Sequence, residues 1–151
     1  MALDSTDIEI LRLLQVDAEL TNKEISVKLH KSVATIHERI RRLKQEGYIK
    51  RVVAILDRRM IGKGLIAFSH VLLKDHSAHT LSSFEEAVVQ FPEVMECVQM
   101  TGTFDFILRI ATADMEEYHT FYRKLAAIST ITTIQSFFVL SEAKSDTAYP
   151  I

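Results

Sequence analysis

The 151-residue sequence contains one cysteine, two prolines, four glycines and no tryptophan. A single cysteine, Cys97, can form neither an intrachain disulfide nor a cysteine-based metal cluster, and we expect it to be a small buried thiol on a strand. No run approaches the roughly 18 apolar residues that cross a bilayer, and the opening residues MALDSTDIEI have neither a basic start nor an apolar signal core. We therefore expect a cytoplasmic protein with no membrane partner. Apolar residues make up 48% of the chain and charged residues 25%, which is typical of packed globular domains and not of disorder.

Charge is distributed unevenly along the chain. Residues 28–63 carry eleven Lys or Arg against three acids, whereas residues 64–151 carry five Lys or Arg against eleven acids. A field of one sign over one domain favours a polyanionic partner, although a solvated helical face would also account for the basic block. The positions of the basic residues around a helix distinguish a polyanion-binding surface from a solvated face.

The first 52 residues have the pattern of three short helices. Residues that cap helices precede each of them, namely Asp4 or Ser5, Thr21 in the capping box TNKE, and Ser32. Gly47 supplies the left-handed residue that would end the third helix. Two helices joined by about four residues, the second of them basic, predict a helix-turn-helix domain over residues 1–52.

The third helix has a polar outer face opposite its apolar residues. Small, hydroxyl and guanidinium groups on such a face suit the major groove of double-stranded DNA, where the first residues of the helix reach base edges and later basic residues bind phosphates. The stretch YIKRVVAIL that follows predicts a short wing or connecting strand, with residues 53–64 as a linker. We assign Ser32, Thr35, His37 and Glu38 mainly to bases or their flanking phosphates, and Arg41, Arg42, Lys50 and Arg51 mainly to the DNA backbone. His37 lies at the flank of the face, so a plain surface histidine is an equal alternative.

Residues 65–151 have a different pattern of apolar residues, which predicts strands and helices in the order β-α-β-β-α-β. This order predicts an α+β fold of the ferredoxin-like type, with two helices on one face of a four-stranded sheet. The predicted strands cover residues 65–74, 94–100, 104–113 and 132–140, and the predicted helices cover 80–91 and 114–128. Both faces of the sheet are apolar in sequence. A face without helices predicts self-association through a two-fold axis.

Three ordered blocks of the chain resemble the Lrp/AsnC family of transcription regulators: LDSTDIEILRLLQVDAELTNKEIS, SVATIHERIRRLKQEGYI and TGTFDFILRI. The resemblance implies a winged helix-turn-helix followed by a ligand-sensing domain that forms dimers and commonly octamers. It also implies that a free amino acid binds between dimers and changes DNA binding or assembly. One departure is that many relatives have glycine at the helix-turn-helix corner, where this chain has His30 or Lys31.

The resemblance places an effector site on the glycine hairpin and the strand facing it. The residues implied are Gly102, Thr103, Phe104, Asp105, Thr133, Gln135 and Ser136. An amino acid needs donors for its carboxylate and an acceptor for its ammonium, and Asp105 offers the acceptor. The alternative is a glycine hairpin whose aspartate only satisfies amides of the turn.

Two other functions are consistent with the same architecture. Siroheme decarboxylases share it, and His70, His76, His79 and His119 could contact a tetrapyrrole or a metal, but the sequence has no catalytic triad or closely spaced carboxylate-histidine set. A DNA-compacting protein without sequence preference is the third possibility. We expect a regulator that is not an enzyme and has neither cofactor nor metal.

Overall fold

The computed structural model describes residues 2–151, and the chain divides into two compact units. One unit runs to Ile55 and includes Ala143–Ile151, and the other is Leu56–Glu142. This grouping differs from the predicted boundaries 1–52, 53–64 and 65–151, because the last residues join the first unit. The amide side chain of Gln15 donates to Tyr149 O at 2.7 Å and accepts from Tyr149 N at 2.9 Å, so the tail is bound in register to the first helix.

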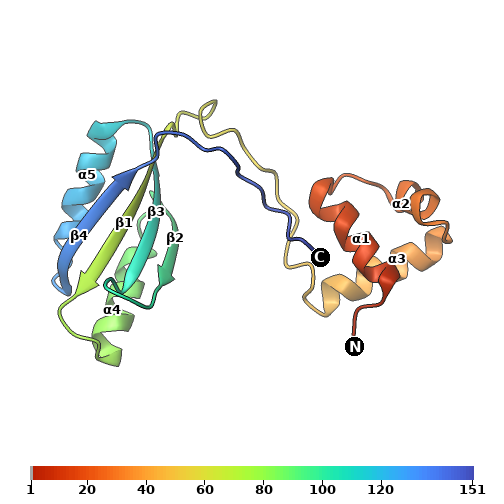
Figure 1. The fold of residues 1–151 in the computed structure, drawn as a ribbon, viewed down its shortest axis with the longest axis horizontal. Coiled ribbons are helices and arrows are strands. Elements are labelled where there is room, and N and C mark those ends of the chain that lie inside the picture. Colours follow the sequence, from red (N-terminus) through yellow and green to blue (C-terminus); the bar gives the residue numbers. More distant parts are fainter. Residues whose placement is uncertain (1) are drawn as a thin grey trace. The chain divides into compact units, whose positions relative to one another are not determined.

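The first unit contains three helices, as predicted: α1 (Ser5–Val16), α2 (Asn22–Leu29) and α3 (Val33–Gln45) (Figure 1). Each begins where a side chain accepts a main-chain N–H of its first turn, and the three caps are Asp4, Thr21 and Ser32. The capping box predicted at Thr21 is present. Four fully buried side chains form the core of this unit: Ile10, Ile25, Ile36 and Leu43.

The corner between α2 and α3 is made by His30, whose φ of 51° and ψ of 44° are left-handed. A side chain at such a position costs about 1–2 kcal/mol relative to the right-handed region, which explains why glycine suits it. The departure noted in the sequence therefore falls on the strained residue. Gly47, with a φ of 81°, follows the last turn of α3 as expected.

The stretch YIKRVVAIL, predicted to form a short wing or connecting strand, contains no strand in this structure. Among the described residues, no strand lies between Ile49 and Gly64, and Val52, Val53, Ile55 and Leu56 are exposed. A strand needs a hydrogen-bonding neighbour, and local β propensity alone provides none.

The second unit has the predicted β-α-β-β-α-β order and is an α+β domain. Its elements are β1 (Leu65–Leu73), α4 (Ala78–Val88), β2 (Val94–Gln99), β3 (Phe106–Thr112), α5 (Met115–Ala126) and β4 (Ile131–Phe138). All pairings are antiparallel and the strand order is β2-β3-β1-β4, so the two middle strands are β3 and β1 (Figure 1).

One face of this sheet forms the core with the helices. Phe106 and Leu108 of β3 are buried with Phe84 of α4 and with Phe121 and Leu125 of α5. Alternate residues on β1 and β4 point to the other face, where Phe68, His70 and Leu72 are half-buried and Phe137 is exposed. This second face, called here the open face, carries both apolar and polar side chains and no helix of the described chain.

Candidate functional site

The outward strip of α3 consists of exposed polar residues, among them Thr35, Glu38 and Arg41. Ser32 Oγ accepts from Thr35 N at 3.1 Å and lies 2.8 Å from Thr35 Oγ1, so both hydroxyls are fixed at the start of the helix. Arg41 and Glu38 form an exposed ion pair that spans one turn. Their hydrogen bond lowers the pKa of Glu38 and raises that of Arg41, which keeps both groups charged.

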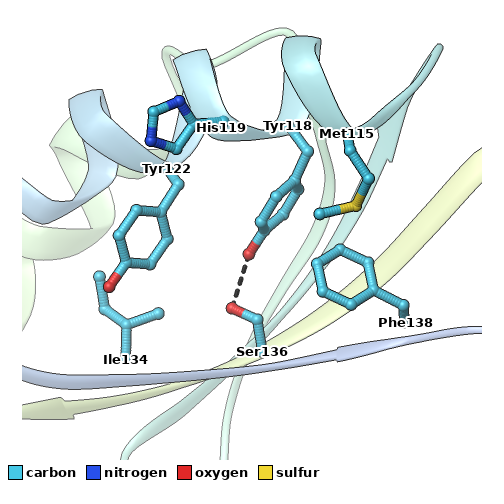
Figure 2. A pocket seen from close by; sticks show the side chains of 7 residues that line it. All are labelled: Met115, Tyr118, His119, Tyr122, Ile134, Ser136 and Phe138. Carbon is cyan, nitrogen blue, oxygen red and sulfur yellow. Dashed lines mark hydrogen bonds between the residues drawn. The ribbon is translucent and has the colours of Figure 1, made fainter.

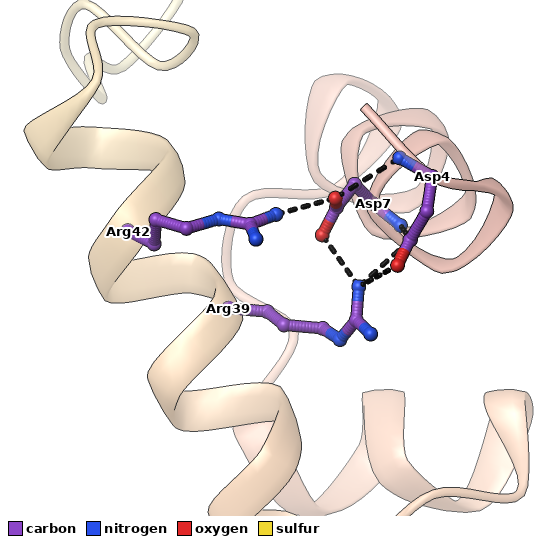
Figure 3. Close-up of polar contacts among 4 residues, drawn as sticks. All are labelled: Asp4, Asp7, Arg39 and Arg42. Atoms are coloured by element: carbon purple, nitrogen blue, oxygen red, sulfur yellow. Dashed lines mark hydrogen bonds and ion pairs between the residues drawn. The ribbon is translucent and has the colours of Figure 1, made fainter. Parts of the chain in front are cut away.

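Arg42, predicted to lie with these residues, does not point outward. Its guanidinium donates to Asp7 of α1, whose side chain is only 1% exposed, and Arg39 bonds the same carboxylate at 2.8 Å (Figure 3). Helical spacing predicts only the direction in which the Cα–Cβ bond of Arg42 leaves α3. It does not account for a long side chain that turns back to a buried acid on a neighbouring helix.

The remaining predicted DNA contacts are exposed. The ring Nδ1 of His37 lies 3.2 Å from the amide nitrogen of Asn22 at the start of α2, so this histidine has a protein partner on the surface. Lys50 and Arg51 are exposed in the irregular segment after α3. The structure therefore gathers Ser32, Thr35, His37, Glu38 and Arg41 on α3 and leaves Lys50 and Arg51 beyond its end.

The glycine hairpin joins β2 to β3, and Asp105 is held firmly at its end. Gly102 has a φ of 118°, which favours glycine, and Asp105 O accepts from Met100 N at 2.7 Å. The carboxylate of Asp105 is 14% exposed and uses both oxygens: Oδ2 accepts from Leu73 N at 2.8 Å, and Oδ1 lies 2.7 Å from Nε2 of His76. One oxygen thus supports the main chain, and the other faces an exposed imidazole.

The strand residues assigned to the same site are split between two faces. Thr133 and Gln135 are exposed on the open face, where they stand opposite Leu72 and His70 in the β1–β4 ladder. Ser136 points to the other side and bonds Ser69 at 2.8 Å and Tyr118 at 2.6 Å. Its assignment beside Gln135 is therefore corrected, because neighbouring residues of a strand point to opposite faces.

Aromatic rings extend the open face toward the hairpin. The ring of His70 lies 5.2 Å from Phe104 and 5.1 Å from Phe137. His70 and Phe137 were not assigned to the effector site from sequence. Phe137 shares strand parity with Gln135 on β4, and His70 of β1 stands opposite Gln135 in the ladder. His76 was also missed, because only its contact with Asp105 reveals a role there.

Ser136 instead lines a separate, mostly apolar cavity of about 320 Å³ between α5 and β4. Figure 2 shows the Tyr118 hydroxyl pointing at Ser136, with Tyr122 and Ile134 on one side and Met115 and Phe138 on the other. The hydroxyl of Tyr118 is satisfied within the protein. This cavity is formed by the helix-covered side of β4 and does not include the glycine hairpin.

The four histidines considered for a tetrapyrrole do not gather. His70 lies on the open face, His119 lines the α5–β4 cavity, His76 contacts Asp105 and His79 belongs to α4. Within residues 2–151, the acids, histidines and cysteine form no group of three or more that could hold a metal ion. No helix of the described chain is long and apolar enough to span a membrane.

Comparison with known proteins covers both units. Residues 3–50 match the family model described as winged helix-turn-helix DNA-binding, and residues 66–149 match the Lrp/AsnC ligand binding domain. The chain is 36% identical over 149 residues to the glutamate uptake regulatory protein of Zymomonas mobilis, covering 99% of this chain and 91% of that protein. It is 31% identical over 150 residues to the DNA-binding transcriptional activator DecR of Escherichia coli, covering 99% of both chains.

Two solved structures of transcriptional regulators are also similar to this chain over nearly its whole length. An AsnC family transcriptional regulator from Agrobacterium tumefaciens has a TM-score of 0.93 and 32% identity, covering 98% of this chain and 97% of that one. A transcriptional regulator from Neisseria meningitidis in complex with L-methionine has a TM-score of 0.94 and 32% identity, covering 99% and 97% of the two chains.

Proposed function

Because the chain belongs to the Lrp/AsnC family of transcription regulators, we propose that it regulates transcription by binding specific DNA sites through α3 and responds to a free amino acid. The observation that carries the DNA part is the exposed polar strip of α3, on the second helix of a helix-turn-helix. Hydroxyl, carboxylate and guanidinium groups there can contact base edges and phosphates. The proposal assigns the chain no catalytic role and no cofactor, and it places the protein in the cytoplasm.

Sequence-specific binding is separated from DNA compaction by one comparison. A duplex selected by the protein from a random library and a scrambled duplex of the same length should differ in affinity by about a thousandfold or more. Equal affinity for the two duplexes would support the compaction alternative.

Base and phosphate contacts on α3 are tested by two variants. Thr35→Ala should change the preferred base at one position of the site, whereas Arg41→Ala should weaken binding to all sequences and reduce the salt slope by about one counterion. Arg12→Ala removes an equal charge from the exposed surface of α1 and is the matched control. An Arg41→Ala slope equal to that of the wild type would remove Arg41 from the phosphate contacts.

We place the effector at the glycine hairpin and the adjoining open face. The ammonium of an amino acid would pair with Asp105 Oδ1, the atom now facing His76, while Thr103, Thr133 and Gln135 offer donors near the hairpin. Two relatives support this ligand class, since one was solved with L-methionine and another is named for glutamate uptake. Ser136 is no longer part of the proposed site.

We propose that two copies of the chain form a homodimer through the open face. By resemblance to the family, we propose further that these dimers assemble into an octamer. Half-buried and exposed side chains such as Phe68, Leu72 and Phe137 would be covered by a second copy. Light scattering should detect no folded monomer at micromolar concentration. A stable monomer there would contradict this use of the open face.

A thermal-shift screen with the twenty amino acids tests the response to a ligand. A ligand that binds only the folded form raises the apparent Tm by mass action. It can alter DNA binding only if it has different affinities for alternative assemblies, so the best ligand should also change the measured affinity for the selected duplex. No shift with any amino acid would contradict the proposed ligand class.

A further inference from the structure

Four charged side chains join the start of α1 to one flank of α3 (Figure 3). Asp7 is buried and accepts from Arg39 at 2.8 Å through Oδ1 and from Arg42 through Oδ2. Arg39 also donates to both oxygens of Asp4, at 2.6 and 2.7 Å. Two acids at the start of α1 therefore hold two of the arginines of α3, the proposed recognition helix.

These contacts are directional, unlike the apolar packing beneath them. Arg39 and Arg42 are three positions apart and share one flank of α3, and charge-assisted guanidinium–carboxylate bonds have restricted geometry. On the opposite flank, His37 contacts Asn22 of α2. Burial of Ile36 and Leu43 turns the apolar stripe of α3 inward, and the directional polar contacts on its two flanks restrict the remaining rotation of the helix about its axis.

We propose that Asp7, supported by Asp4, is a positioning residue for DNA recognition, which fixes the rotation of α3 and withholds Arg39 and Arg42 from DNA phosphates. The first effect presents Thr35, Glu38 and Arg41 outward. The second limits sequence-independent affinity, because phosphate contacts supply nearly all of non-specific binding. Both effects raise the ratio between specific and non-specific affinity.

Asp4 has two roles in this cluster. Asp4 is both the N-cap of α1 and an ion-pair partner, and its hydrogen bond from Arg39 lowers the pKa of the carboxyl to about 2. The Asp4 carboxylate therefore stays charged at neutral pH. Asn at the same position would keep the cap and lose the ion pair, which allows the two roles to be separated.

The test is the Asp7→Asn variant, which preserves the shape of the side chain and removes its charge. Dissociation constants are measured over a range of salt concentrations on the duplex selected by the wild type and on a scrambled duplex of equal length. Affinity for the scrambled duplex should rise, its salt slope should steepen by about one counterion, and the specificity ratio should fall about tenfold. A folded variant with an unchanged slope and ratio would overturn the proposal, even if its Tm were lower.

Three further variants make the result unambiguous. Glu9→Gln removes the same charge from an exposed site of α1 and should leave both the slope and the ratio unchanged. Asp7→Asn combined with Arg42→Gln should lose the rise in non-specific affinity while the ratio stays low, because rotation remains unrestrained. If Asp7→Asn does not fold, Asp4→Asn applies the same test to Arg39, and a wild-type slope and ratio in that variant would overturn the proposal.

Discussion

Replacement of Asp105 separates its structural role from its proposed role in ligand binding. Oδ2 accepts from Leu73 N at 2.8 Å and Oδ1 lies 2.7 Å from His76 Nε2. In Asp105→Asn the amide oxygen can keep the bond to Leu73, but the amide nitrogen cannot accept from an ammonium. The lost charge-assisted bond is worth about 1.5–3 kcal/mol, which corresponds to roughly ten- to hundredfold in effector affinity.

Asp105→Ala removes the acceptor for Leu73 as well. A buried amide without a partner costs about 1–3 kcal/mol, so the alanine variant should lower the free energy of unfolding by about that much more than the asparagine variant. His76→Ala leaves the carboxylate intact and removes the group that occupies Oδ1, so effector affinity should be unchanged or higher.

The assay is isothermal calorimetry with the amino acid that gives the largest thermal shift, together with urea denaturation of each variant. Equal affinity of the wild type and Asp105→Asn would refute the role in binding and leave Asp105 as an acceptor for the end of β1. Loss of basal DNA binding in Asp105→Asn would show that the residue supports the fold.

Three further outcomes follow from the same structure. Hydrogen bonds from Arg39 and Ser77 lower the pKa values of Asp4 and Asp75, respectively, to about 2. The stability that these carboxylates contribute is therefore present above about pH 4 and is lost as the pH falls toward 2. Urea titrations at several pH values should show this fall in the free energy of unfolding, and a smaller fall in Asp4→Asn. Cys97 is partly buried, and this burial raises the pKa of its thiol to about 11. The thiol should therefore react with iodoacetamide at pH 8 about a hundredfold more slowly than free cysteine, and an equal rate would contradict its partial burial. His30→Gly relieves a left-handed side chain and should raise the free energy of unfolding by about 0.5–1 kcal/mol, net of the greater entropy of the unfolded chain; a lower free energy would show that the imidazole stabilises the corner.

Helix starts and strand order were predictable because they depend on local chemistry. Asp4, Thr21, Ser32 and Asp114 cap helices as their hydrogen-bonding side chains indicate. The apolar periodicities gave all four strands of the second unit and both of its helices. The start of α4 was placed at residue 80 instead of Ala78, because the capping role of Ser77 was overlooked.

Long-range contacts account for the errors. The direction of the Arg42 side chain depends on Asp7, a buried residue of α1 that lies 35 positions away in the sequence. The stretch YIKRVVAIL forms no strand because local propensity does not supply a pairing partner. The bonds between Tyr149 and Gln15 are also long-range, and nothing local in the sequence of the tail indicates them.

Ser136 is a different kind of error, because its correction was available in the sequence. Within a strand, residues that share a face differ by an even number, so Thr133 and Gln135 cannot line the same surface as Ser136. The same parity would have added Phe137 to the open face. His76 could not have been found this way, since it follows β1 in a loop and reaches Asp105 only in the folded chain.

Selection of binding sites from a random duplex library, with the wild-type protein, tests the central claim most directly. The account predicts enrichment of a two-fold symmetric sequence whose half-sites lie about one helical turn, or a multiple of it, apart. It also predicts that Thr35→Ala changes the preferred base within each half-site while the spacing stays the same. Recovery of no sequence above the random background, from a folded protein that binds DNA, would contradict the claim that α3 recognises specific sites.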